Sequence, residues 1–145
     1  MMLPTNEKVR FLRHVGILSS IEDDRLTDLA CRMKEVRLSA GETLFKRGDT
    51  GTLMYIIMKG TMRVHVEDRV LAELGERDVL GEMAALDPEP RSASVTAIEN
   101  SLLLSLDHHD IRRLIKLDVE VALGLIRTLC RRLRRVASQS VAAPA

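Results

Sequence analysis

The chain reads Gly81-Glu82-Met83-Ala84-Ala85-Leu86 and, after a short Pro-containing link, Pro90-Arg91-Ser92-Ala93-Ser94-Val95, and this stretch combines turn residues with two charged side chains. Gly81 can adopt backbone angles closed to other residues, which suits a sharp turn out of the apolar segment before it. The next five residues favour one turn of helix, which Asp87-Pro88 ends. Because such a short helix leaves its first amide groups unpaired, and its side chains are small, an anion can approach the backbone.

Two charged side chains add chemistry to this turn. Arg91 carries a planar guanidinium that fits two phosphate oxygens, and Ser92 offers a hydroxyl donor. Glu82 would repel a phosphate, but its carboxylate is a strong acceptor for a sugar hydroxyl. Together these groups predict a site for a ribose phosphate. The alternative is an ordinary surface helix with an arginine–carboxylate pair.

The same stretch resembles the phosphate-binding cassette of cyclic nucleotide-binding domains, as in the bacterial cAMP receptor protein, protein kinase A regulatory subunits and cyclic nucleotide-gated channels. The shared pattern is Gly-Glu, then small and apolar residues, then Pro-Arg followed by small residues. The resemblance implies that Glu82 binds the ribose 2′-hydroxyl and that Arg91 binds the cyclic phosphate. It also implies that the ligand site includes Gly81, Met83, Ala84, Ala85, Ser92 and Ala93.

Length and composition fit one globular domain. The chain has 145 residues, of which 46% are hydrophobic and 30% charged. The sequence has no apolar run long enough to span a membrane and no signal-peptide pattern at its start, and Cys31 and Cys130 are expected to be reduced thiols, so we expect a cytoplasmic protein. Since aromatic residues make up only 2%, recognition of single-stranded nucleic acid by base stacking is disfavoured.

Apolar alternation and turn residues predict a series of short strands through the middle of the chain, over 34–39, 42–45, 53–58, 61–66, 70–74, 92–97 and 101–106. About eight such strands imply an antiparallel barrel or jelly roll. We predict an α+β fold, an antiparallel β-roll (jelly-roll barrel) flanked by N-terminal helices and by C-terminal hinge and lid helices. The predicted domain covers 1–137, and a disordered tail, 138–145, follows it. Within the domain we predict helices in 1–33, the β-roll in 34–106 with the cassette at 81–93, and helices in 107–137.

Two helix starts carry capping signals. Ser20 is expected to cap the second helix, with Asp23 as its reciprocal partner. Asp107 is expected to cap a helix over 108–117.

The last helix carries an apolar seam and many arginines. The seam is spaced four, three, four, three, which suits either a short coiled coil or packing on the barrel: Ala122, Ile126, Leu129, Leu133 and Val136. The resemblance implies that this helix covers the pocket, so Arg131 and Arg134 are candidates for a cation–π lid over the base. The arginines also suit helix-dipole capping or an acidic partner.

The histidines argue against a metal-binding cupin, the other jelly-roll class considered. Cupins need two histidines two apart on one strand, whereas His65 stands alone on its strand and His108-His109 are adjacent. We therefore predict no metal site and no prosthetic group. The sequence also suggests no catalytic triad by its spacing, so the protein is expected not to be an enzyme.

The predicted function is a regulatory sensor that binds a cyclic nucleotide, moves its C-terminal helices and signals to an unidentified effector protein. cAMP is favoured over cGMP, although Val136-Ala137 stand where the bacterial activator has an adenine-contacting Thr-Ser pair. A homodimer through 119–137 is expected, and 138–145 leave no room for a DNA-binding domain. Two alternatives are a β-roll sensor of a different small effector and a ligand-independent interaction module acting through the basic C-terminal helix.

Overall fold

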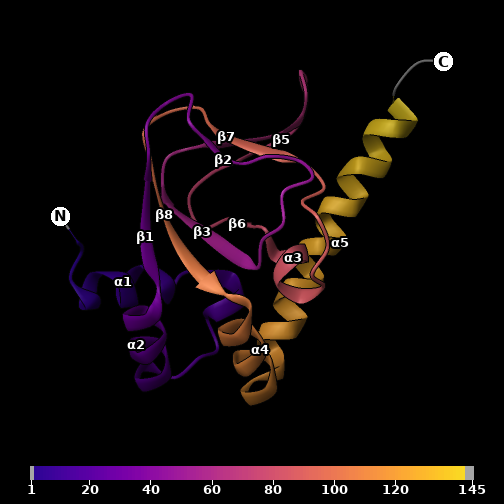
Figure 1. Cartoon of the computed structure of the whole chain (residues 1–145). Coiled ribbons are helices and arrows are strands. Elements are labelled where there is room, and N and C mark those ends of the chain that lie inside the picture. Colours follow the sequence, from indigo (N-terminus) through magenta and orange to yellow (C-terminus); the bar gives the residue numbers. More distant parts are fainter. Residues whose placement is uncertain (1, 143–145) are drawn as a thin grey trace.

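The computed structural model describes residues 2–142, which form a β-roll flanked by helices (Figure 1). Two four-stranded antiparallel sheets have the orders β1-β8-β3-β6 and β2-β7-β4-β5. This confirms the predicted α+β class. The strands are β1 Lys34–Leu38, β2 Thr43–Phe45, β3 Leu53–Lys59, β4 Met62–Val66, β5 Arg69–Leu74, β6 Val79–Leu80, β7 Ser94–Ala97 and β8 Ser101–Asp107.

The helices gather at one end and one side of the roll. In Figure 1, α1 and α2 lie with α4 at one end, and α5 runs along the side past α3. The helices are α1 Thr5–Leu12, η1 Gly16–Leu18, α2 Asp23–Arg32, α3 Glu82–Leu86, α4 His108–Leu117 and α5 Val119–Ala142.

Strand β6 was not predicted, because two residues are too few to show an alternating pattern. It pairs with β3 through Tyr55↔Leu80 and Ile56↔Val79. Both of its residues are buried. A buried strand therefore ends directly before Gly81, and this strand fixes the position at which the cassette begins.

The two capping predictions had different outcomes. Asp107 is the N-cap of α4, and its carboxylate accepts a hydrogen bond from the His109 amide, as predicted. The prediction for Ser20 was wrong, since α2 has Glu22 as its N-cap and no side-chain cap. The Ser20 hydroxyl instead donates to Asp118 Oδ2 at 2.9 Å, so it ties the start of α2 to the junction of α4 and α5.

Helix α5 is longer than predicted. It continues to Ala142, so residues 138–142 are helical and do not belong to a disordered tail. Glycine and proline, the two residues that most strongly break helices, do not occur between Ala137 and Ala142. Residues 143–145 of the predicted tail lie outside the described part of the chain.

The core has two parts. One lies where the β1-β8-β3-β6 sheet meets the helices, and it includes Leu12, Leu26, Ile56, Leu104 and Leu125. The other lies within the roll, and it includes Ile57, Met62, Val95 and Leu103. Because both faces of β3 and β8 are covered, these strands hold the cassette on a rigid base.

Helix α5 packs tightly on η1 near its first turns. A Cβ added to Gly124 would lie 3.0 Å from Cα of Ile17, so the glycine allows the two backbones to approach. Val121 and Leu125, which flank it in sequence, are fully buried. The first part of α5 is therefore fixed to the body of the domain.

A buried ion pair joins α1 to the first strand. Lys8 Nζ lies 3.5 Å from Glu35 Oε2, and both side chains are buried. The Leu3 amide donates to the same oxygen at 2.7 Å, and Arg37 lies 3.0 Å from Oε1. Burial by itself raises the pKa of Glu35, but the Leu3 hydrogen bond and the two cations outweigh it and lower the pKa.

Candidate functional site

The cassette has the backbone geometry that its sequence predicts. Gly81 has φ of 72°, in the left-handed region, and α3 starts at the next residue. Ala84 and Ala85 are buried beneath the turn, whereas Met83 is 57% exposed. The turn therefore presents backbone and small side chains on one side and a mobile thioether chain to solvent.

Arg91 is held in a fixed position. Its guanidinium donates to the Leu53 carbonyl at 3.0 Å and to the Gly81 carbonyl at 3.5 Å. It also lies 4.1 Å from the centre of the Phe45 ring, in a cation–π contact. Burial lowers the pKa of Arg91, although an arginine remains charged at neutral pH. The site therefore holds a positive charge before any anion arrives.

Two glycines make room for that guanidinium. A Cβ on Gly81 would lie 2.6 Å from Nη1 of Arg91, and a Cβ on Gly51 would lie 2.9 Å from Nη2. The sequence predicted a turn at Gly81, and Gly51 lies between two of the predicted strands. It carried no signal that Gly51 lies against Arg91, since the two residues are far apart in the chain.

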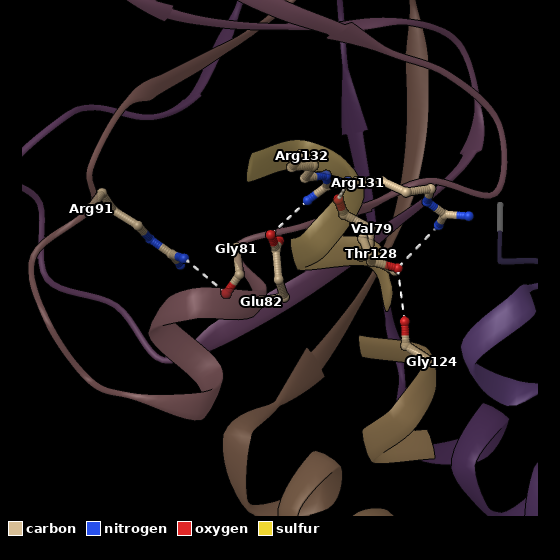
Figure 2. A network of polar contacts seen from close by, with 8 residues as sticks. All are labelled: Val79, Gly81, Glu82, Arg91, Gly124, Thr128, Arg131 and Arg132. Atoms are coloured by element: carbon tan, nitrogen blue, oxygen red, sulfur yellow. Dashed lines mark hydrogen bonds and ion pairs between the residues drawn. The ribbon is translucent and has the colours of Figure 1, made fainter. Parts of the chain in front are cut away.

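Glu82 is bound by an arginine from the last helix. Arg132 Nη1 lies 2.6 Å from Glu82 Oε1, and Arg132 Nη2 donates to the Val79 carbonyl at 2.5 Å. The Glu82 side chain is 6% exposed and that of Arg132 is 26% exposed. Figure 2 shows the pair, with Arg91 on the opposite side of Glu82. Arg132 was not among the predicted site residues, and its contact with Glu82 was not predicted.

A pocket of about 390 Å³ lies between the cassette, the β4–β5 hairpin and α5. This volume is within the range of small-molecule sites. The predicted ligand residues that line it are Gly81, Glu82, Met83, Ala84, Arg91, Ser92 and Ala93. Ala85, also predicted, is fully buried under the turn and is not among the lining residues.

The arginines of α5 that line the pocket are not the ones that were predicted. Arg132, Arg135 and Val136 line it, and Arg131 and Arg134 do not. Positions spaced by three and four share one helix face, which explains the grouping of 132, 135 and 136. Arg131 instead donates to the Thr128 hydroxyl at 3.3 Å (Figure 2).

The predicted apolar seam of α5 is not packed on the barrel as one face. Ile126, Leu133 and Val136 are 53%, 69% and 52% exposed. The face that packs on the domain is instead formed by Val121, Leu125 and Thr128, which are buried. Ile126 and Leu133 therefore do not pack on the barrel, whereas Val136 lines the pocket.

No helix within residues 2–142 is long and apolar enough to cross a membrane. In the same part of the chain, no group of three or more His, Cys, Asp or Glu side chains is arranged to hold a metal ion.

The fold and pocket define a small-ligand-binding β-roll domain with a helix against its binding site. The family profile described as "Cyclic nucleotide-binding domain" matches residues 35–118, and the chain belongs to this family.

Two curated relatives are similar to this chain. The chain is 31% identical over 129 residues to a "CRP-like cAMP-activated global transcriptional regulator" of Mycobacterium tuberculosis, covering 86% of this chain and 58% of that protein. It is 39% identical over 113 residues to the "Cyclic AMP receptor protein" of Thermus thermophilus, covering 74% of this chain and 52% of the relative. The chain thus spans about half the length of these curated relatives.

A solved structure described as "cAMP bound PfPKA-R (141-441)" has a TM-score of 0.83, with 22% identity, and the match covers 94% of this chain and 47% of that one. At this identity the likeness supports the fold.

Proposed function

We propose that this protein is a regulatory sensor that binds a cyclic nucleotide in the pocket between the cassette and α5. The observation that carries the proposal is the placement of Arg91 and Glu82, a buried cation and a buried carboxylate on one cavity wall. The cation suits the cyclic phosphate, and the carboxylate suits the ribose 2′-hydroxyl. cAMP is the first ligand to test, because relatives are named for it, and cGMP is the second.

Calorimetric titration tests this proposal. The protein is unfolded and refolded to remove any copurified ligand, and it is then titrated with cAMP and cGMP. Micromolar or tighter binding is expected for at least one of them. No heat and no shift of the melting temperature with either nucleotide would reject the proposed function.

The contact between Glu82 and Arg132 suggests how binding is transmitted. Arg132 occupies Oε1 of Glu82, and within the described residues no hydrogen bond reaches Oε2. A ribose hydroxyl on Oε2 would share the carboxylate with Arg132, so ligand and helix α5 are coupled through one group. A ligand that strengthens this pair shifts the population toward one arrangement of α5, which an effector protein can detect. If the rates of amide hydrogen exchange over 119–142 are the same with and without saturating nucleotide, this mechanism is wrong.

Replacing Glu82 with glutamine is expected to reduce the preference for ribose over 2′-deoxyribose by about tenfold, because the hydroxyl loses a charged acceptor. The measurement is the affinity of each variant for cAMP and for 2′-deoxy-cAMP. Glu89→Gln is the matched control, since Glu89 also lines the pocket but is exposed. If Glu82→Gln leaves the ratio of the affinities for cAMP and 2′-deoxy-cAMP unchanged, Glu82 does not bind the ribose hydroxyl.

We also propose that two copies of the chain pair through α5. The exposed apolar side chains Ile126, Leu133 and Val136 follow the heptad spacing of a coiled coil. Leu133→Ser is expected to raise the dimer dissociation constant by about tenfold, because each copy loses buried apolar area. Analytical ultracentrifugation measures this, with Arg134→Ser on the next position as the control. A wild-type protein that stays monomeric at high concentration would contradict the proposal.

A further inference from the structure

Phe45 is an aromatic residue that lies against the guanidinium of Arg91. It belongs to β2, where it pairs with Val95 of β7, the strand that follows the cassette. Cζ of Arg91 lies over the Phe45 ring, 4.1 Å from its centre. Phe45 and Arg91 both line the pocket. The ring therefore touches the cation in the part of the pocket where we expect the phosphate.

The backbone of Arg91 is bound to the loop that follows Phe45. The Gly48 amide donates to the Arg91 carbonyl, and the Arg91 amide donates to the Asp49 carbonyl, both at 2.8 Å. Because β2 ends at Phe45 and leads directly into this loop, the backbones of Phe45 and Arg91 are held close together. The direction of the guanidinium then depends on the contacts of the side chain itself.

Three contacts, two hydrogen bonds and one ring contact, hold the guanidinium. Nη2 donates to the Leu53 carbonyl at 3.0 Å, and Nη1 donates to the Gly81 carbonyl at 3.5 Å. The hydrogen bonds hold the two terminal nitrogens, whereas the Phe45 ring supports the carbon between them. Without the ring, the group would keep only two carbonyl partners, one of them at a long distance.

The Phe45 ring is itself supported by Tyr55 of β3. The two ring centres are 6.2 Å apart and the rings are tilted by 33°, an arrangement that is typical of aromatic pairs. Tyr55 is buried, and it pairs with Leu80, the residue before Gly81. Packed contacts therefore run from the central strand β3 through two rings to the guanidinium, so Phe45 is a firm support.

We propose that Phe45 is a positioning residue for the phosphate, because its ring keeps the Arg91 guanidinium ordered before the anion binds. The inference rests on the proposed function, since it requires a cyclic phosphate at Arg91. Ordering one long side chain during binding weakens the affinity by about two- to tenfold, and a side chain that is already ordered avoids this loss. In the described part of the chain, the hydrogen bonds of Arg91 use two of the five N–H donors of a guanidinium, so donors remain for a phosphate.

Calorimetric titration of two Phe45 variants tests the role of the ring, with whichever of cAMP and cGMP binds the wild type more tightly. Phe45→Leu removes the ring and keeps an apolar side chain, and it is expected to raise the Kd by about fivefold. Phe45→Tyr keeps the ring and should bind within about twofold of the wild type. An unchanged Kd in Phe45→Leu, or equal losses in the two variants, would overturn the inference and leave the proposed function standing.

A double-mutant cycle tests whether Phe45 acts through Arg91. Arg91→Lys keeps the charge but has no planar group for the ring to orient, so Phe45→Leu added to it should change the Kd by less than about twofold. Val64→Ala is the control, since Val64 is another half-buried apolar residue of the pocket wall but is not part of the ring contact. Its effect should be the same with and without Arg91→Lys. If the effect of Phe45→Leu is also the same in both backgrounds, the loss comes from general packing and the inference is wrong.

A measurement without nucleotide separates this inference from the proposed function. NMR relaxation of the Arg91 Nε–H bond in the wild type should give an order parameter near the backbone value of about 0.85, and Phe45→Leu should lower it below about 0.6. The exposed Arg69 provides the value of a free side chain. If Arg91 in the wild type is as mobile as Arg69, the inference is wrong whether or not a nucleotide binds. If Arg91 is ordered but neither cAMP nor cGMP binds, the proposed function is overturned, and the role of Phe45 in phosphate binding with it.

Discussion

Replacing Arg91 with alanine is expected to weaken cyclic nucleotide binding by about thirtyfold to several thousandfold. The guanidinium is buried at the end of the pocket, where a phosphate would be largely removed from water. Removing one partner of a buried, hydrogen-bonded charge pair costs about 2–5 kcal/mol, which corresponds to an effect of this size. Calorimetric titration of the two proteins measures it.

Controls distinguish binding from folding in this experiment. Arg91→Ala also removes one hydrogen bond from the Leu53 carbonyl and one from the Gly81 carbonyl, which keeps the Ala85 amide as a donor, so a lower melting temperature is expected, with the fold kept. Arg91→Lys keeps the charge but loses the planar fork, and it should recover part of the affinity. Arg69→Ala, on an exposed strand position, should bind as the wild type does. Equal affinities for wild type and Arg91→Ala would exclude Arg91 from the phosphate site.

Replacing Glu35 with glutamine is expected to lower the free energy of unfolding at neutral pH by about 3 kcal/mol, the scale for a buried ion pair that loses one partner. The substitution keeps the shape of the side chain and removes its charge. Lys8 is then left buried without its counterion, and the Leu3 amide loses a charged acceptor. Chemical denaturation at neutral pH measures the difference.

The same substitution makes a prediction about pH. The pKa of Glu35 is lower in the folded state than its usual value of 4.5, so the folded state binds its proton less readily than the unfolded state does. The stabilisation is therefore fully present above the unfolded-state pKa and is lost as the pH falls through the folded-state pKa. The difference in stability between the wild type and Glu35→Gln should therefore shrink as the pH falls below 4.5 and through the lowered folded-state pKa of Glu35. Glu76→Gln, at an exposed position, is the control, and a difference that stays constant down to pH 3 would contradict the role of the Glu35 charge.

The cassette could be predicted from sequence because its chemistry is local. Gly81, Glu82 and Arg91 lie within one short segment, and a glycine, a helical turn and a proline fix their relative positions. The partner of Glu82 could not be predicted in this way, because Arg132 is 50 residues away. Which arginine of a basic helix reaches the pocket depends on how that helix is rotated, and local sequence does not determine the rotation.

Helix α5 illustrates the same limit. Its heptad pattern was predicted from the sequence, whereas a second set of apolar positions, which includes Val121 and Leu125, was not identified. Both sets have helical spacing, so periodicity alone does not say which one faces the domain. The close approach of Gly124 to Ile17 decides this, because it is possible only with Val121 and Leu125 turned inward.

That close approach also makes α5 a lever with its fulcrum at Gly124. At 1.5 Å per residue, Arg132 lies about 12 Å from the fulcrum and Ala142 about 27 Å from it. If the helix tilts as a rigid rod, a displacement of 1 Å at Arg132 becomes one of about 2 Å at the far end. A small adjustment around the Glu82 carboxylate would thus be enlarged mechanically where another polypeptide could sense it.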